Sequence, residues 1–419
     1  MSKPTLLFRG PVKTLSGYGS HSRDLLKSLY DMDLFDISID SSNWGSTPLT
    51  ALEPETNIFH LWIDENIVSK SIPQPDIYIQ VTVPNEFNPI GKYNIGITAG
   101  IETTVAPKSW IDGCNRMDKV ITTSTFSRDV LLQTVYNEND KISGKLINQH
   151  KIDVPLEILH EGVDTSVYNN ISTDFELDIE EEFAYLFVGH WLTGKVGHDR
   201  KDVGMLIKCF CDSFDGVGER PCLILKTSSA TFSVKQRESL RSKITNITKH
   251  YDNPPSIYLL FGQLTDDEMN GLYNHPKVKS MVTITKGEGY GRPLLEFTMT
   301  GKPVIASNWS GHKDFLPMDK AIMVGGKLTH VDESATNDFI LKTSKWFTSN
   351  YSEVTEVFKI VHKDYDDFLE RSESLREDNI KSFSIDSMTE KFKVMLEPLL
   401  VEKPKQVKLN IPQLKKIDK

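Results

Sequence analysis

Residues 285–307 read TKGEGYGRPLLEFTMTGKPVIAS, and the order of residue types in this stretch indicates the class of fold. The β-branched run SMVTIT that leads into it predicts a buried strand, and Gly289 and Gly291 form a turn whose backbone can approach a ligand closely. Pro293 suits the first turn of a helix, Gly301 ends that helix, and PVIAS is the next strand. Strand, glycine loop, helix and strand form the repeating unit of a parallel α/β sheet.

Two glutamates lie on either side of this turn, Glu288 in the glycine loop and Glu296 in the helix. Loops at the carboxyl edge of a parallel sheet bind ligands, and helix N-termini favour phosphate groups. A carboxylate does not bind phosphate, but it accepts hydrogen bonds from hydroxyls and matches a sugar diol. An acid, a run of backbone amides and a second acid therefore predict a nucleotide-sugar as the ligand.

The same alternation of strands and helices runs through most of the 419 residues. Because this length exceeds one typical core, we expect two doubly wound Rossmann-like α/β domains that face each other across a cleft. The acidic segment STDFELDIEEEF indicates a linker. The expected parts are an N-terminal acceptor-side domain at 1–170, a C-terminal donor-binding domain at 171–385, a helix at 386–402 that returns to the first domain, and a basic tail at 403–419.

Local patterns predict the individual elements. PTLLFRG predicts a strand, PVKTLSGYGS a loop, and the helix is expected to start only at His21. TNIFHLWI at 56–63 predicts a further strand. The stretch from about 335 to 402, FILKTSKWFT included, is expected to be helical.

Composition limits the class of protein. The formal net charge of −10 and pI near 5.6 argue against a chain that coats nucleic acid or an anionic membrane. The sequence shows neither a run of about 18 apolar residues, as a membrane span needs, nor a signal-peptide pattern at MSKPTLLFRG. Its four cysteines lack metal-site spacing and indicate reduced thiols. We expect a cytoplasmic protein.

GEGYGRPLLEFTMTGKPVIAS resembles the E-x7-E segment of the retaining glycosyltransferases of family 4 (glycosyl transferases group 1), which have the GT-B fold. The resemblance implies that Glu288 contacts hydroxyls of the donor sugar and that Glu296 contacts the ribose. It also implies that the backbone amides of Gly289, Tyr290 and Gly291 face the sugar and the diphosphate.

Further segments are similar to this family in the same order along the chain. SGYGSHSRDLL resembles its N-terminal glycine loop, so Gly17, Tyr18 and Gly19 would face the diphosphate from the other domain. TTSTFSRDVL and LEILHEGVDTSVY resemble segments late in its N-terminal domain. FAYLFVGHWLTGKVGHDRKDVGMLI resembles the opening of its C-terminal domain.

The family neutralises the leaving diphosphate with an arginine and a lysine. Lys201 matches the lysine, whereas His190 stands where the arginine would be. We expect Arg200 to supply the second charge from a lengthened loop, because a preorganised cation pair best stabilises a departing diphosphate. The alternative interpretation is an exposed charge run over 199–202.

Other polar residues carry weaker expectations. Glu102 follows a strand end on the acceptor side and is expected to contact the acceptor or the sugar, or else to be a helix-start acid. Single histidines at strand ends, such as His160, are expected to be structural. The acid pair at 31–33 lies between a helix and a strand and is interpreted as a turn, so no metal site is expected.

The expected function is metal-independent transfer of a hexose or pentose from a nucleotide-sugar to an acceptor hydroxyl. The resemblance implies that the anomeric configuration is retained. The nucleotide-sugar is a co-substrate, and no cofactor is expected. The acceptor is open among glycan, lipid, protein and modified DNA, and the Lys-rich tail could meet an acidic partner. Two alternatives remain: a GT-B epimerase or phosphorylase, and a non-catalytic nucleotide-sugar-binding subunit.

Overall fold

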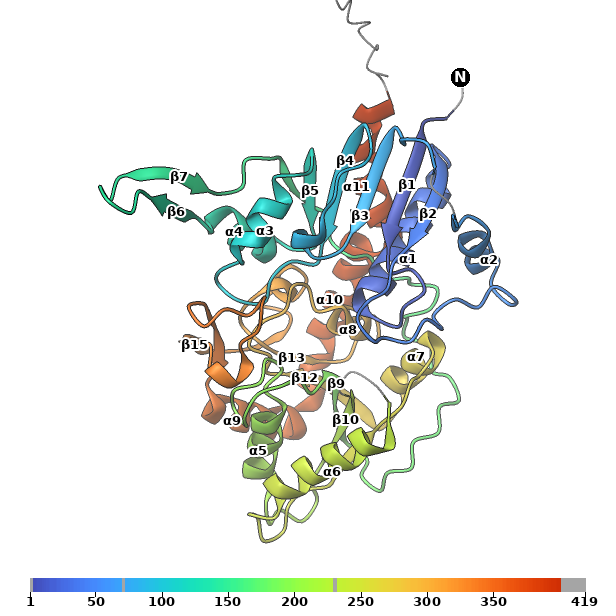
Figure 1. Cartoon of the computed structure of the whole chain (residues 1–419). Coiled ribbons are helices and arrows are strands. Elements are labelled where there is room, and N and C mark those ends of the chain that lie inside the picture. Colours follow the sequence, from blue (N-terminus) through green and yellow to red (C-terminus); the bar gives the residue numbers. More distant parts are fainter. Residues whose placement is uncertain (1–2, 70–71, 229–231, 401–419) are drawn as a thin grey trace, which may run out of the picture.

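The computed structural model describes residues 3–69, 72–228 and 232–400. Its two large sheets each contain six strands, and all neighbouring strands within them are parallel (Figure 1). Separate apolar cores fill the two faces of each sheet, where helices pack against the strands. The predicted doubly wound architecture with two Rossmann-like units is confirmed.

The first sheet has the order β2-β1-β3-β4-β5-β8. Its central strand, IYIQV, is buried along its whole length, as a parallel strand covered on both faces should be. The elements of this part are β1 (Thr5–Gly10), α1 (Gly17–Met32), β2 (Asp36–Ser41), α2 (Ile58–Glu65), β3 (Ile77–Val81), β4 (Tyr93–Thr98), α3 (Lys108–Cys114), β5 (Lys119–Thr122), α4 (Thr125–Gln133), β6 (Tyr136–Asn139), β7 (Leu146–His150) and β8 (Leu156–Ile158).

The second sheet has the order β11-β10-β9-β12-β13-β14. The order reverses between β9 and β12, and ligands of open α/β sheets bind beyond the carboxyl ends of the strands at such a point. The elements are β9 (Ala184–His190), α5 (Val203–Phe214), β10 (Cys222–Ser228), α6 (Val234–Thr248), β11 (Ile257–Leu260), α7 (Asp266–Asn274), β12 (Val278–Thr283), α8 (Arg292–Thr298), β13 (Val304–Ser307), β14 (Ile322–Val324), β15 (Gly326–His330), β16 (Lys345–Ser349), α9 (Tyr351–Lys363), α10 (Leu369–Phe383) and α11 (Ile385–Leu396).

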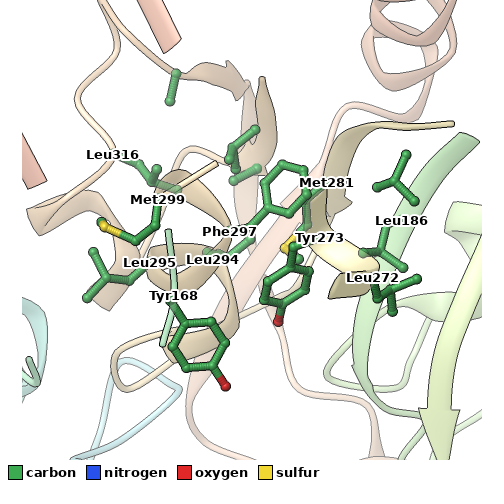
Figure 2. Close-up of a cluster of buried hydrophobic side chains, with 14 of the residues drawn as sticks. Tyr168, Leu186, Leu272, Tyr273, Met281, Leu294, Leu295, Phe297, Met299 and Leu316 are labelled. Carbon is green, nitrogen blue, oxygen red and sulfur yellow. The ribbon is translucent and has the colours of Figure 1, made fainter. Parts of the chain in front are cut away.

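Helix α8 is anchored by an apolar cluster that it shares with strands of the second sheet (Figure 2). Leu294, Leu295 and Phe297 of this helix belong to the same cluster as Met281 of β12 and Tyr273 of α7. Because the helix and the strand before it share one core, the loop that joins them, which carries Glu288, is fixed at both ends.

The last helix leaves the second sheet and packs against the first part of the chain (Figure 1). Met388, Phe392 and Leu396 of α11 lie in the core that also contains Leu25 of α1. The hydroxyls of Ser28 and Thr389 are 2.7 Å apart across this contact. The predicted tail at 403–419 lies outside the described residues.

Three local predictions are wrong. Helix α1 begins at Gly17 rather than His21, because the hydroxyl of Ser16 caps the amide of Gly19. The segment 56–63 is mostly helical, since Asn57 caps the amides that open α2. Residues 345–349 form a strand, β16, which pairs with β15 in an antiparallel hairpin that the sequence did not predict. A second hairpin that was not predicted is formed by β6 and β7.

Candidate active site

Two loops from opposite parts of the molecule meet where strands β4 and β12 end. A side chain on Gly287 would place its Cβ 2.0 Å from the carbonyl oxygen of Glu102, and one on Gly289 would lie 2.1 Å from that of Ala99. Only glycine permits this approach, so the GEG sequence joins the two parts at this point. The hydroxyl of Ser124 also donates to the carbonyl of Gly289 at 2.6 Å.

The segment Asp199-Arg200-Lys201-Asp202 lies between β9 and α5, at the switch point of the second sheet. Neither aspartate is exposed, and the side chains of Arg200 and Lys201 are 14 and 15% exposed. The carbonyl of Arg200 accepts a hydrogen bond from the amide of Lys286 at 2.7 Å. The alternative interpretation of residues 199–202 as an exposed charge run is therefore wrong. The loop after β12 holds this segment in place through the hydrogen bond from Lys286.

Glu288 is the centre of the cation cluster. Its Oε1 accepts from Nζ of Lys201, and its Oε2 lies 3.2 Å from a guanidinium nitrogen of Arg200. Its amide donates to the hydroxyl of Ser310 at 2.9 Å. Burial alone would raise the pKa of Glu288, but the charges of Lys201 and Arg200 outweigh burial and lower it to about 2. Glu288 is therefore ionised at neutral pH.

Arg200 connects this cluster to the first sheet. Its guanidinium donates to the carbonyl of Gly287 at 2.9 Å and lies 3.5 Å from Oε1 of Glu102. The four residues predicted to be catalytic, Glu102, Arg200, Lys201 and Glu288, thus form one group in space. His190, at the end of β9, is exposed and its Nδ1 lies 3.1 Å from the hydroxyl of Ser228.

Glu296 lies on α8 in a separate group of charges. Nε of Arg292 donates to its Oε1 at 2.7 Å, and the same guanidinium pairs with Asp24 of α1 and lies 3.8 Å from Glu161. Burial raises the pKa of Glu296 to about 7, because one shared guanidinium compensates too little. Burial likewise raises the pKa of Glu161 to about 8.

The two GYG sequences differ in structure. Gly17, Tyr18 and Gly19 form the first turn of α1, and the hydroxyl of Tyr18 accepts from the amide of Ala99 at 3.1 Å. A Cβ on Gly19 would lie 2.2 Å from the carbonyl of Thr14.

In the second sequence, Tyr290 is buried and its hydroxyl donates to the carbonyl of Glu161 at 2.8 Å. Gly291 has a φ of 101°, which favours glycine, immediately before α8. Its position fixes where the helix begins relative to the loop that carries Glu288.

Sequence reasoning missed the contacts that close this site. Asp314, in the 3₁₀ turn Gly311–Asp314, accepts from the amide of Thr125 at 2.7 Å, and its Oδ2 lies 3.0 Å from Nε2 of His160. Phe126 and Trp309 pack edge to face with ring centroids 4.7 Å apart. No local sequence pattern indicates these contacts, because contacts between distant loops leave no periodicity.

Within the described residues, no group of three or more histidine, cysteine or acidic side chains could hold a metal ion. Nor do the helices of this part of the chain include one long and apolar enough to cross a membrane.

Comparison with known proteins gives structural matches only. No family model matches the sequence, and no curated protein matches it. The structure of HepE from Anabaena, in complex with UDP and glucose, is 12% identical, with a TM-score of 0.64 over 94% of this chain and 100% of that one. A glycosyltransferase from Rickettsia africae is 14% identical, with a TM-score of 0.60 over 96% and 100%. Sucrose-phosphate synthase from Thermosynechococcus elongatus is 12% identical, with a TM-score of 0.59 over 95% and 99%. The chain has the GT-B fold of these glycosyltransferases.

Proposed function

We propose that this protein is a retaining glycosyltransferase that moves a sugar from a nucleoside-diphosphate donor to an acceptor hydroxyl without a metal ion. The observation that carries the proposal is the buried group of Arg200, Lys201 and Glu288 at the switch point of the second sheet. The structures of HepE with UDP-glucose and with UDP and glucose support a donor of this class.

In this mechanism the two cations stabilise the departing diphosphate. Negative charge builds on the leaving phosphate oxygen as the sugar bond breaks, and cations fixed in a closed site stabilise it without reorganising. In the structure, Glu288 forms ion pairs with both cations, and Glu102 lies 3.5 Å from Arg200. A bound diphosphate would take over those ion pairs and leave the carboxylate of Glu288 free to accept hydrogen bonds from sugar hydroxyls.

The remaining groups bind the rest of the donor and the acceptor. Glu296 would bind the ribose through Oε2. Arg292 donates to Oε1 at 2.7 Å, whereas Oε2 accepts a longer hydrogen bond of 3.4 Å from the hydroxyl of Tyr273, which the ribose would replace. Glu102 would contact the acceptor or the transferred sugar from the first part of the molecule. We favour front-face attack, in which the leaving phosphate oxygen takes the proton of the acceptor hydroxyl. The loops that close the site would exclude water and limit hydrolysis.

The setting and the partners are part of the same proposal. The nucleotide-sugar is a co-substrate and not a resident cofactor, and the reaction takes place in the cytoplasm. The acceptor is a glycan, a lipid, a protein or modified DNA. The Lys-rich tail at 403–419 would meet an acidic partner.

The test begins with thermal stabilisation by a panel of nucleotide-sugars, because a ligand that binds only the folded state raises the melting temperature. The stabilising donor is then incubated with candidate acceptors in EDTA, and NMR assigns the anomeric configuration of the product. A retained glycoside formed in EDTA supports the proposal. An inverted product would refute retention, and an epimerised or phosphorolysed sugar would identify the alternative enzymes. Binding without turnover or hydrolysis would indicate a binding subunit.

A further inference from the structure

Lys286 is a buried lysine directly before the loop that carries Glu288. Its side chain is 1% exposed, and Nζ lies 2.9 Å from Oδ2 of Asp202, whose side chain is fully buried. A buried charge is tolerated only with a partner. The pair therefore lies beneath the surface of the site, where neither side chain can reach a ligand.

The backbone of Lys286 joins three segments that approach the site separately. Its amide donates to the carbonyl of Arg200 at 2.7 Å, and its carbonyl accepts from the amide of Phe347 at 2.9 Å. The hydroxyl of Thr285 also donates to the carbonyl of Arg200, at 3.2 Å. Lys286 thus connects three parts of the chain: residues 199–202, which we call the cation segment, the loop that carries Glu288, which we call the acid loop, and strand β16.

Asp202 has a backbone conformation that favours glycine, which indicates that its carboxylate is needed at this position. Its φ of 54° lies in the left-handed region. A glycine would adopt this conformation without strain, but it would have no carboxylate. The carboxylate of Asp202 is bound by Lys286 and by the hydroxyl of Tyr351, which donates to Oδ2 at 2.8 Å.

Hydrogen bonds and aromatic rings hold the ammonium group itself. Nζ of Lys286 donates to the hydroxyl of Thr348 at 3.2 Å and lies 5.9 Å from the ring centroids of Trp346 and Tyr351. Two of these residues belong to β16, a strand outside the six-stranded sheet. This hairpin strand therefore supports the cation segment from behind.

We propose that Lys286, paired with Asp202, is a positioning residue that sets Arg200 and Lys201 at the distance from Glu288 needed to bind the donor diphosphate. The inference rests on the proposed function for the identity of that ligand. Asp202 is the residue directly after Lys201 and precedes the first residue of α5. A shift of its carboxylate would move the cation segment relative to the acid loop.

The test compares Lys286→Met, the double variant Lys286→Met with Asp202→Gly, and Lys302→Met as the control. Lys302 is a partly buried lysine, and its Nζ donates to the carbonyls of Tyr273, His275 and Val278, away from the cation segment. Removing one partner of a buried pair is strongly destabilising, whereas replacing both partners by well-packed apolar residues is often neutral. Methionine keeps most of the volume of Lys286, and glycine suits the positive φ of Asp202. The double variant therefore reports on positioning even if the single variant fails to fold.

We expect the double variant to keep the wild-type melting temperature within a few degrees and to bind the stabilising nucleotide-sugar about 10- to 100-fold more weakly, because misplaced groups at a site cost that much. Lys302→Met should lower the melting temperature and leave donor affinity unchanged. Wild-type affinity in the folded double variant would overturn the inference.

A second measurement needs no donor. The backbone amide of position 286 donates to the carbonyl of Arg200. Its hydrogen exchange should become faster in the double variant and stay slow in Lys302→Met. Unchanged exchange would overturn the positioning role. If the wild-type protein bound no nucleotide-sugar at all, the proposed function would fail, and the exchange rates would still decide whether Lys286 braces the cation segment.

Discussion

Glu288 and Glu296 are both buried, both pair with an arginine and come from one short stretch, yet their pKa values shift in opposite directions. Glu288 faces Lys201 and Arg200, and its pKa falls to about 2. Glu296 shares Arg292 with Asp24 and Glu161, and its pKa rises to about 7. The number of cations per carboxylate, and not burial, decides which acid keeps its charge.

The largest effect on activity is expected from removing one of the two cations that pair with Glu288. Lys201→Ala removes one of them and one of the two groups proposed to stabilise the diphosphate, so kcat/KM should fall about 100- to 1,000-fold. Lys208→Ala is the matched control, because Lys208 lies on α5 and pairs with exposed Asp212. Steady-state kinetics measures both variants. Wild-type activity in Lys201→Ala would show that Lys201 does not take part in catalysis.

Glu288→Gln separates sugar binding from diphosphate binding. The amide no longer competes for Lys201 and Arg200, so the affinity for the free nucleoside diphosphate should stay equal or rise. Transfer should fall about 10- to 100-fold, since the charged acceptor for the sugar hydroxyls is lost. Calorimetric titration gives the affinities. A large loss of diphosphate affinity would show that Glu288 does not compete for the cations.

Stability should depend on pH in opposite ways at the two glutamates. The folded state holds the proton of Glu296 up to about pH 7, whereas the unfolded chain releases it near pH 4.3. The free energy of unfolding therefore decreases as the pH rises from about 4.3 to about 7, by up to about 1.4 kcal/mol per pH unit. Glu296→Gln should flatten this slope.

Glu288 has the reverse sign, because its folded pKa of about 2 lies below the unfolded value. Its contribution is complete above about pH 4.3 and is lost as the pH falls toward 2. Glu288→Gln should therefore remove part of the acid sensitivity and leave the slope near pH 6 unchanged. Urea unfolding between pH 3 and 8 measures both variants, and identical profiles would contradict the comparison.

The smallest effect is expected at Glu102. Its carboxylate lies 3.5 Å from Arg200 and its side chain is 30% exposed, so this ion pair should be worth less than about 1 kcal/mol. Glu102→Gln should change donor affinity less than about fivefold and should act mainly on the KM of the acceptor. Kinetics with varied acceptor tests this, and a loss as large as that of Lys201→Ala would give Glu102 a larger role.

The sequence was sufficient for the architecture and for the residues near the GEG turn. A β-branched strand, glycines and a helix-breaking Gly301 are local signals, so residues 285–307 fold as expected. The strand predicted at 56–63 is mostly a helix, because a short apolar segment suits a helix as well as a strand. Strand β16 was missed because it is set by pairing with β15.

The electrostatics of the site could not be predicted from the sequence. The run at 199–202 looks like a solvated charge cluster, and only its burial against Lys286 shows otherwise. In the same way, the sharing of Arg292 among three acids depends on α1, α8 and Glu161 meeting in space. Such pairs join residues that are far apart in the chain and follow no period.

The most direct test is the dissociation constant of the best stabilising nucleotide-sugar, measured by calorimetry for the wild-type protein, Lys201→Ala and Lys302→Met. If the donor diphosphate binds at Arg200 and Lys201, Lys201→Ala should lose about 10- to 100-fold in affinity, because one charge-assisted contact is lost. Lys302→Met should bind as the wild type does. Equal affinity in all three proteins would contradict the account.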